Sequence, residues 1–233
     1  MTKSIINKPD FEYTGKENLE IMALAVKYNA EIYKFITRGI CENTKILEFG
    51  AGRGEYCNRF ESQDRMTAIE LDKTFFPLLN CAKKYSSIDQ MDEKIDLIYT
   101  INVMEHIENE QEVIEQFKKV LKKGGLVRVF VPAFQILYCI MDQRVGHFRR
   151  YHMGEIIKLF ETNGFKTNYA SYFDFVGFFA MMWYKYFGNK HGFFEEKPII
   201  FFDKYIFPIS RFLDKITFGK ILGKNLILEF ELK

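Results

Sequence analysis

Three glycines at alternate positions, Gly50, Gly52 and Gly54, directly follow the apolar segment ILEF. Glycines in such a place allow positive φ angles and let a ligand lie against bare backbone. A dinucleotide site would carry G-x-G-x-x-G, but Glu55 occupies the position of the third glycine, and no Lys-Ser or Lys-Thr follows as a P-loop requires. Glu70 ends the next apolar segment about twenty residues downstream, where a carboxylate can accept hydrogen bonds from a ribose. The pattern favours an adenosine-containing ligand, and the alternative is an ordinary tight turn.

Histidines farther along the chain could provide acid–base chemistry. His106 lies in MEHIEN after an apolar segment, and His147 lies in RVGHFRRY. We expect His147 to be a base or to orient a substrate, with Tyr151 and His106 behind it, because a neutral hydroxyl or an ammonium must lose a proton to act as a nucleophile. For either histidine the alternative is a structural hydrogen bond. His152 and His191 carry no supporting context.

Three arginines lie near His147 in the sequence, namely Arg144, Arg149 and Arg150. A guanidinium fork matches the oxygens of a phosphate or a carboxylate, so the group predicts an anionic substrate. The alternative is ion pairing inside the protein, for which the candidate partners are Glu105, Asp142 and Glu155.

The spacing of apolar residues predicts strands that alternate with helices. Asp72 and Asn109 are suited to cap helices, Pro77 to kink one, and Gly124 and Gly164 to end two. Such alternation predicts an α/β fold, with a parallel sheet and helices on both faces. We expect helices at 17–38, near Glu55, and at 72–85, 109–124 and 154–165, and strands at 45–49, 66–70, 95–101, 126–132, 166–173 and 225–232.

The composition indicates one globular domain of 233 residues, 48% of them hydrophobic. A formal net charge of +2 gives no case for a nucleic-acid partner. The four cysteines are scattered without a CxxC pair, and the N-terminus lacks the apolar core of a signal peptide. We therefore expect reduced thiols in the cytoplasm and no metal. The apolar run 175–184 is too short to span a membrane.

Five segments occur in the order ILEFGAGRGEY, AIELD, IDLIYTINVMEHIEN, LKKGGLVRVFVPAF and GHFRRYHMGEIIKLFETNGF. With them the chain resembles the class I S-adenosylmethionine (SAM)-dependent methyltransferases, most of all the bacterial branch in which V-P-A-F is followed by G-H-x-R-R-Y. The resemblance implies a Rossmann-like, seven-stranded, mostly parallel sheet with a reversed last strand. The expected parts of this single domain are an N-terminal helical segment (1–44), the cofactor-binding core (45–173), an aromatic-rich helical cap (174–224) and the final strand (225–233).

The resemblance also implies roles for residues around the glycine loop. Glu70 would hold the ribose hydroxyls of SAM, Leu71 would lie against the adenine, and Asn102 would face the amino-acid end or the sulfonium. The segment that should hold the third strand is short for the family, so Asp89 or Ile88 would have to contact the adenine amine. The residues that would surround the methionine part are Glu48, Gly50, Ala51 and Gly52.

The activity implied is transfer of a methyl group from SAM to a small-molecule or glycan- or lipid-linked acceptor, at oxygen, with S-adenosylhomocysteine (SAH) as the product. Alignment of the acceptor with the methyl group can be worth roughly 7 to 11 kcal/mol. INVMEH stands where methyltransferases acting on nucleic-acid amines carry an Asn/Asp-Pro-Pro-aromatic turn, which disfavours such substrates. The alternatives are a catalytically lapsed scaffold or activator subunit and, less favoured by the glycine spacing, a nicotinamide-dependent oxidoreductase.

Aromatic residues are abundant, with 25 Phe and 13 Tyr, many of them in the last third of the chain. The segment 172–212 predicts a lid over the acceptor, the surface of a homodimer, or a patch in peripheral contact with lipid. An amphiphilic acceptor would suit both these aromatics and the three arginines.

Overall fold

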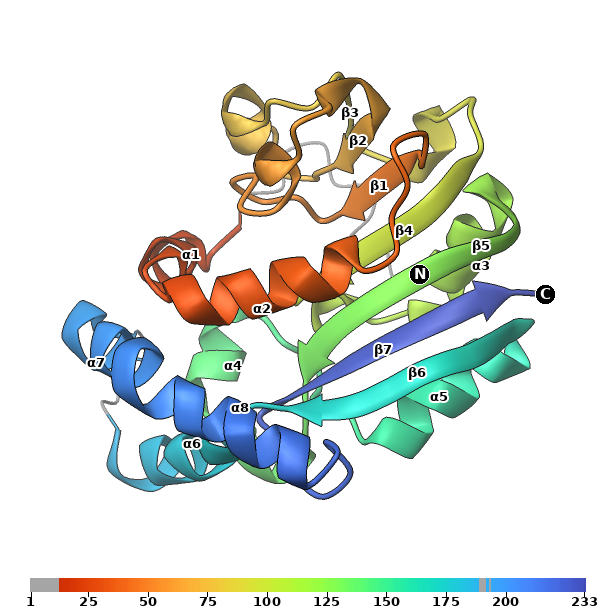
Figure 1. Ribbon diagram of the computed structural model, residues 1–233. Coiled ribbons are helices and arrows are strands. Elements are labelled where there is room, and N and C mark those ends of the chain that lie inside the picture. The colour runs from red at the N-terminus through yellow and green to blue at the C-terminus, as the bar shows by residue number, and fades with distance from the viewer. Residues whose placement is uncertain (1–12, 189–191, 193) are drawn as a thin grey trace.

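The computed structural model describes residues 13–188, 192 and 194–233, and within them seven strands form one mixed sheet (Figure 1). The strand order is β3-β2-β1-β4-β5-β7-β6. β1 to β5 run parallel, whereas β7 is antiparallel to both β5 and β6, so the expected α/β fold with a reversed last strand is confirmed. The strands are β1 (Ile46–Phe49), β2 (Met66–Ile69), β3 (Lys83–Tyr85), β4 (Ile95–Ile101), β5 (Leu121–Pro132), β6 (Phe165–Phe173) and β7 (Asn225–Leu232).

The order of the strands reverses at β1, which pairs with β2 on one side and with β4 on the other. In this register Glu48 lies between Ala68 and Tyr99. Ligands of open α/β sheets bind outside the carboxyl ends of the strands at such a reversal. The glycine loop, which begins directly after Phe49, therefore lies where a ligand is expected.

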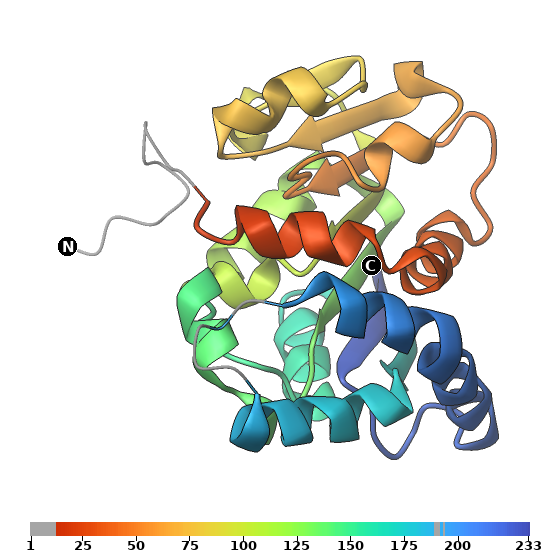
Figure 2. The ribbon, with the colours of Figure 1, turned by 90° about the vertical axis from the view of Figure 1, so that its left-hand side faces the viewer.

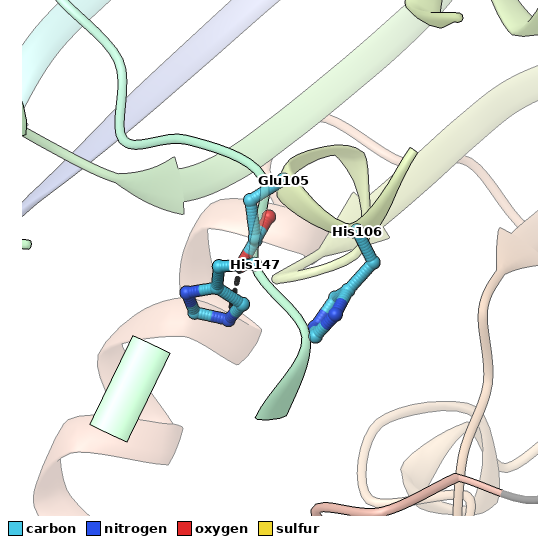
Figure 3. A group of neighbouring side chains, drawn as sticks. All are labelled: Glu105, His106 and His147. Atoms are coloured by element: carbon cyan, nitrogen blue, oxygen red, sulfur yellow. Dashed lines mark ion pairs between the residues drawn. The ribbon is translucent and has the colours of Figure 1, made fainter. Parts of the chain in front are cut away.

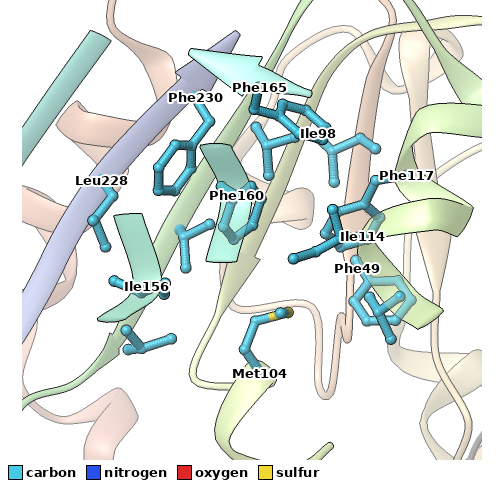
Figure 4. Close-up of a cluster of buried hydrophobic side chains, with 14 of the residues drawn as sticks. Phe49, Ile98, Met104, Ile114, Phe117, Ile156, Phe160, Phe165, Leu228 and Phe230 are labelled. Atoms are coloured by element: carbon cyan, nitrogen blue, oxygen red, sulfur yellow. The ribbon is translucent and has the colours of Figure 1, made fainter. Parts of the chain in front are cut away.

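Helices cover both faces of the sheet, and the strands are accordingly apolar on both sides. α2 (Val26–Thr37) packs on one face, and α3 (Glu110–Val120) and α5 (Met153–Thr162) pack on the other (Figure 1). On the second face, Phe117 and Phe160 join Ile98 and Phe230 in one buried cluster (Figure 4). The rings of Phe160 and Phe230 stack with their centroids 4.0 Å apart. Each such side chain contributes about 1.5 to 3 kcal/mol through burial, so this cluster holds the helices rigidly on the sheet.

The segment between β6 and β7 forms the helical cap. It contains α6 (Phe175–Phe187), α7 (Glu196–Phe201), a π-helical turn (Phe202–Ile206) and α8 (Phe207–Ile216). Buried carboxylates fasten these helices together, since Asp214 accepts hydrogen bonds from the backbone of Asp174 and Phe175, both 2.9 Å long, and the hydroxyl of Ser210 donates to Asp174. Figure 2 shows α1 (Lys16–Ala23) lying between the β1–β3 half of the molecule and the cap.

Membrane-spanning helices are not found in the part of the chain that the structure describes. The four cysteines are free thiols, in keeping with the expectation from their scattered positions. His191 and the first twelve residues of the expected N-terminal segment lie outside the described residues.

The prediction of a single helix at 17–38 is wrong, because Leu24 and Ala25 separate two helices, α1 and α2. The cause is a distant carboxylate. Asp203 of the cap accepts hydrogen bonds from the backbone N–H groups of Lys27 (3.0 Å) and Tyr28 (2.8 Å), and so provides the N-terminal cap that begins a second helix.

The expectations of helices near Glu55 and at 72–85 are also wrong. After the glycine loop the chain makes turns and only a short 3-10 helix, Cys57–Arg59. In the second segment Asp72 does cap, accepting from the N–H of Thr74, but the 3-10 helix Lys73–Leu78 contains Pro77, which has no N–H to donate. The chain then extends into β3, which is the third strand that the sequence appeared too short to hold.

The helix expected at 109–124 is shorter than predicted. α3 ends at Val120, and Leu121 already pairs with Ile95 of β4, so Gly124 lies within β5 and does not end the helix. The side chain of Asn109 makes no capping hydrogen bond. By contrast, Gly164 follows the end of α5 with φ of 90°, as expected for a residue that terminates a helix.

Candidate active site

A cavity of about 570 Å³ opens at the carboxyl ends of β1, β2 and β4. This volume is typical of sites that enclose a cofactor or a small ligand. The wall is mostly apolar and is completed by α1, by the start of α2 and by the cap, which contributes Met181 and Phe194. All the residues expected to hold a cofactor border this one cavity: Glu48, Gly50, Ala51, Gly52, Glu70, Leu71 and Asn102.

The glycine loop is fixed to β2 by its backbone. The N–H groups of Gly50 and Ala51 donate to the carbonyl of Ile69 at 2.8 and 3.1 Å. Gly50 has φ of 81°, and a Cβ atom there would lie 2.3 Å from Cγ2 of Val103, so no other residue fits without displacing its neighbour. At Gly52, φ is 52°, and among the described residues the one atom within 4 Å of an added Cβ atom would be Cδ1 of Leu19, at 3.7 Å. A side chain at Gly52 would therefore occupy space that a ligand could use.

Glu70 lies at the end of β2 beside this loop and is buried. Its carboxylate accepts hydrogen bonds from the N–H groups of Gly52 (2.6 Å) and Asp72 (2.8 Å). Burial raises the pKa of Glu70, and these hydrogen bonds offset part of the rise. Of the two candidates for contact with the adenine amine, Ile88 borders the cavity. Asp89 is exposed, and its Oδ1 lies 3.8 Å from Nζ of Lys119. The structure thus does not bring Asp89 to the site.

Glu48 ties the loop to the sheet. Its buried carboxylate accepts from the N–H of Cys57 (3.0 Å) and from the hydroxyl of Tyr99 (2.9 Å). Burial raises the pKa of Glu48 to about 8. Asn102 follows β4 with φ of 53°, an uncommon value for a residue other than glycine and one that is often found at functional sites.

The raised pKa of Glu48 predicts how stability depends on pH. Because the folded state favours the protonated form, this residue contributes stability that is complete below pH 4.5 and is lost as the pH rises through about 8. We expect the thermal unfolding midpoint of Glu48→Gln to fall less over this range than that of the wild type, and Glu42→Gln, at an exposed position, to behave like the wild type. Parallel pH profiles for Glu48→Gln and the wild type would show that Glu48 is ionised throughout.

A second group of polar residues lies farther along the cavity. Glu105 and His106 belong to the 3-10 helix Met104–His106 after β4, and His147 follows α4 (Ile140–Val145). Nδ1 of His147 is 2.7 Å from Oδ1 of Asp142, and its Nε2 is 3.7 Å from Oε1 of Glu105 (Figure 3). The rings of His106 and His147 meet edge to face with their centroids 4.5 Å apart. Both histidines border the cavity, as expected.

Burial controls the charges of this group. It raises the pKa of Glu105 to about 7 and lowers the pKa of His106 to about 3, which leaves His106 neutral. Burial alone would also raise the pKa of Asp142, but the hydrogen bond from His147 and the charge of Arg150 bring it below its ordinary value. Asp142 is therefore an ionised carboxylate that holds His147 in place.

The three arginines do not form the expected anion-binding cluster. Arg150 is buried, and its Nε lies 3.0 Å from Oδ1 of Asp142, which matches the ion-pair alternative. Arg149 pairs with Glu110 and donates to the carbonyl of Glu108, and neither Arg149 nor Arg144 borders the cavity. Arg150 does border it, and its Nη1 is buried without a hydrogen-bond partner among the residues that the structure describes.

Tyr151 is not at the cavity either. It is buried in the core, and its hydroxyl donates to Glu110. Burial raises its pKa, so it is a poor proton donor or acceptor for a bound substrate. Its neighbour His152 lies at the start of α5 beside Phe134, away from the site, as its lack of sequence context suggested.

Several residues of the cavity wall were not found from the sequence. Tyr13, Asn18 and Leu19 come from the N-terminal segment, and Lys224 precedes β7. Amphipathic spacing can place a residue on the inner face of a helix, but it does not show that the residue closes a cavity built by distant strands. The role of Asp142 had a partial signal, since it was a candidate ion-pair partner of the arginines.

A family model described as a methyltransferase domain matches residues 22–170. The chain belongs to this methyltransferase family. A relative from Methanocaldococcus jannaschii, an uncharacterized protein, is 30% identical over 206 residues, which cover 81% of this chain and 80% of the relative.

Solved structures share the methyltransferase fold. A methyltransferase in complex with the Haloferax volcanii Trm112 methyltransferase activator superposes with a TM-score of 0.60 and 8% identity over 99% of both chains. The mycolic acid cyclopropane synthase CmaA1, complexed with SAH and CTAB, gives a TM-score of 0.57 and 13% identity over 87% of this chain and 82% of that one. At such low identity these likenesses show the fold alone, which is that of SAM-dependent methyltransferases.

This methyltransferase fold implies SAM as the cofactor, and the residues present fit it. The space that a Cβ atom of Gly52 would fill faces the cavity, and the carboxylate of Glu70 lies beside it. Each oxygen of Glu70 accepts one backbone N–H, which leaves lone pairs for the hydroxyls of a ribose.

Proposed function

We propose that this chain is an active SAM-dependent methyltransferase that transfers a methyl group to a hydroxyl of an amphiphilic small-molecule or glycan- or lipid-linked acceptor. The observation that carries the proposal is the continuity of the cavity, whose wall includes the glycine loop and Glu70 as well as His106 and His147. SAM, when bound, supplies an activated methyl group: the acceptor oxygen bonds to the methyl carbon, the carbon–sulfur bond breaks with its electron pair left on sulfur, and the hydroxyl proton passes to solvent.

Different residues of the chain would bind different parts of SAM. Glu70, oriented by the N–H groups of Gly52 and Asp72, accepts from the ribose hydroxyls. Leu71 and Ile88 give the adenine apolar walls. The backbone of the glycine loop and Asn102 hold the amino-acid end, and Glu48 acts by fixing the loop rather than through a free carboxylate.

His147 would orient the acceptor hydroxyl. Its hydrogen bond to Asp142 fixes the ring and its tautomer, so that Nδ1 carries the proton and Nε2 is free to accept. The unpartnered Nη1 of Arg150 offers a contact for an anionic group of the acceptor, so the proposed anionic recognition rests on this arginine and not on Arg144 or Arg149.

The direct test is calorimetric titration with SAM and SAH. We expect each to bind as one ligand per chain, and SAH to prevail over NAD(H) in competition. The neighbour from Haloferax volcanii forms a complex with an activator, and a catalytically lapsed scaffold is the alternative for this chain. Absence of heat with both ligands would favour the scaffold over the enzyme.

The outer face of the cap supports an amphiphilic acceptor. Two stripes of exposed aromatic and aliphatic side chains lie on its helices. The hydrogen bond from the N–H of Val176 to the hydroxyl of Ser210 joins these helices. One stripe recurs at helical spacing along α6, and the other continues along α7, the π-helical turn and α8. Their members are Phe179, Trp183, Tyr186 and Phe187 on α6, and Phe201, Tyr205, Ile209, Phe212 and Ile216 on the second helix run.

The exposed charges of the cap complement an anionic lipid surface. Asp203 and Asp214 are buried, and the exposed acids of the cap are Glu195 and Glu196. Among the described residues of the cap, the exposed lysines number four, Lys197, Lys204, Lys215 and Lys220. Aromatic residues flanked by lysines are typical of interfacial contacts with membranes. We therefore propose that the cap contacts a lipid surface and brings the cavity to its acceptor there.

Vesicle sedimentation tests this contact. We expect the wild type to sediment with vesicles of phosphatidylcholine and phosphatidylglycerol, and the double variant Trp183→Ser, Phe187→Ser to partition roughly tenfold less, because two exposed aromatics no longer enter the interface. Leu78→Ser, at an exposed position outside the cap, should match the wild type. If the variant instead changes only the molecular mass seen in sedimentation velocity, the face is a homodimer surface.

A further inference from the structure

Glu105 is in an unusual position for a carboxylate. It is fully buried, and neither of its oxygens has a hydrogen-bond partner among the described residues. The charged groups that influence it most are His147 and Arg150, and neither donates a hydrogen bond to it. Nε2 of His147 lies 3.7 Å from Oε1 of Glu105, which is too far for a hydrogen bond. A buried carboxylate without a hydrogen-bond partner is costly, so a cation bound beside it would stabilise the site.

Two imidazoles lie next to this carboxylate. One ligand atom from each of Glu105, His106 and His147 can be chosen so that all three lie within 4.8 Å of one another. Figure 3 shows the carboxylate directed at the ring of His147, with the ring of His106 beside it. Two ligands of one ion lie at most about 4.2 Å apart when each bond is about 2.1 Å long, so the longest separation in the group has to shorten by at least roughly half an ångström to close on an ion.

The surroundings of His147 are those of a metal ligand. Its Nδ1 is held by the ionised carboxylate of Asp142, and an outer partner of this kind fixes a histidine so that its other nitrogen is available to a metal. Arg150 in turn fixes Asp142, which keeps this support rigid. The ring of His106 packs edge to face against the rings of Tyr13 and His147.

We propose that Glu105, His106 and His147 bind one divalent transition-metal ion and that an oxygen of the methyl acceptor completes its coordination. Nε2 of His147 then orients the acceptor through the ion rather than by a direct hydrogen bond. Two imidazoles with one carboxylate suit Mn²⁺, Fe²⁺ or Zn²⁺ better than Mg²⁺ or Ca²⁺, which prefer oxygen ligands alone. Three protein ligands leave coordination positions open, as metal sites that bind a substrate do. This assignment departs from the sequence expectation of no metal.

The position of the site defines the class of acceptor. His106 and His147 border the same cavity as the glycine loop, so an ion between them faces the space left beside the cofactor. A hydroxyl bound to the ion becomes more acidic and is held in one orientation, which makes a hydroxyl or a pair of adjacent hydroxyls the fitting acceptor group. The role of the acceptor rests on the proposed methyl transfer, whereas the binding of the ion does not.

Binding of Mn²⁺, followed by electron paramagnetic resonance on protein treated with a chelator, tests the site. Manganese is the appropriate probe because it avoids thiolates, and the chain has four free cysteines. We expect one Mn²⁺ per chain in the wild type, and binding at least about tenfold weaker in Glu105→Gln and in His147→Gln. His152→Gln, a histidine outside the group, should bind like the wild type.

Control measurements separate a lost ligand from a lost fold and from a failed function. Circular dichroism and the binding of SAH should be unchanged in Glu105→Gln, because Glu105 lies outside the glycine loop. Wild-type protein that binds SAH but no Mn²⁺, or Mn²⁺ binding that survives both ligand substitutions, overturns the metal site and leaves the methyltransferase proposal standing. Mn²⁺ binding without SAH binding would support the metal site and contradict the methyltransferase proposal.

Discussion

Replacing Glu70 with alanine is expected to weaken the binding of SAH at least about hundredfold in calorimetry. The carboxylate would accept both ribose hydroxyls, and hydrogen bonds to a charged group are worth about 1.5 to 3 kcal/mol each. The N–H groups of Gly52 and Asp72 would also lose the acceptor that now fixes the loop. Gly52→Leu should have a similar effect for a different reason, because its side chain would occupy the space between Gly52 and Leu19.

Asp89→Ala is the matched control for this experiment. Asp89 lies on the short segment after β3, but its carboxylate is exposed and faces Lys119 instead of the cavity. SAH should bind to this variant as it does to the wild type. Unchanged affinity in Glu70→Ala, with the fold intact, would mean that the ribose is held elsewhere or that no such ligand binds.

The second large effect is expected at Asp142, whose carboxylate accepts from Arg150, from the backbone N–H of Cys139 and from the ring of His147. Asp142→Asn leaves the buried guanidinium of Arg150 without a counter-charge, which should lower the free energy of unfolding by about 3 to 5 kcal/mol in urea denaturation. The double variant Asp142→Asn, Arg150→Met should lose less than the sum of the single losses, because no unpaired charge then remains buried.

A surface ion pair provides the comparison. Glu115 and Lys118 are partly exposed neighbours on α3, and Glu115→Gln should cost less than about 1 kcal/mol. If Asp142→Asn lowers the free energy of unfolding no more than Glu115→Gln does, the buried ion pair between Asp142 and Arg150 does not stabilise the fold.

The sheet could be predicted from the sequence because its signals are local. Segment 95–101 is apolar nearly throughout, segment 225–232 alternates imperfectly between apolar and polar residues, and each is a strand with the expected bounds. The glycine loop and Glu70 were placed correctly relative to each other because the carboxyl ends of neighbouring parallel strands share one edge of the sheet.

The departures arise from contacts between residues far apart in the chain. The break between α1 and α2 depends on Asp203, and the burial of Arg150 depends on Asp142, neither of which the spacing of apolar residues can reveal. Glu105 lies beside His106 in the sequence, yet its burial without a partner and its nearness to His147 emerge only when the segment after α4 returns to the end of β4.

The crystal structure of the complex with SAH is the most direct test of the central claim, that one cavity holds the methyl donor on the glycine loop and the acceptor beside His106 and His147. We expect the ribose to lie on Glu70 and the sulfur to be directed at the two histidines. A sulfur more than about 10 Å from both rings, beyond the reach of any direct proton transfer, or SAH bound away from the glycine loop would contradict this claim.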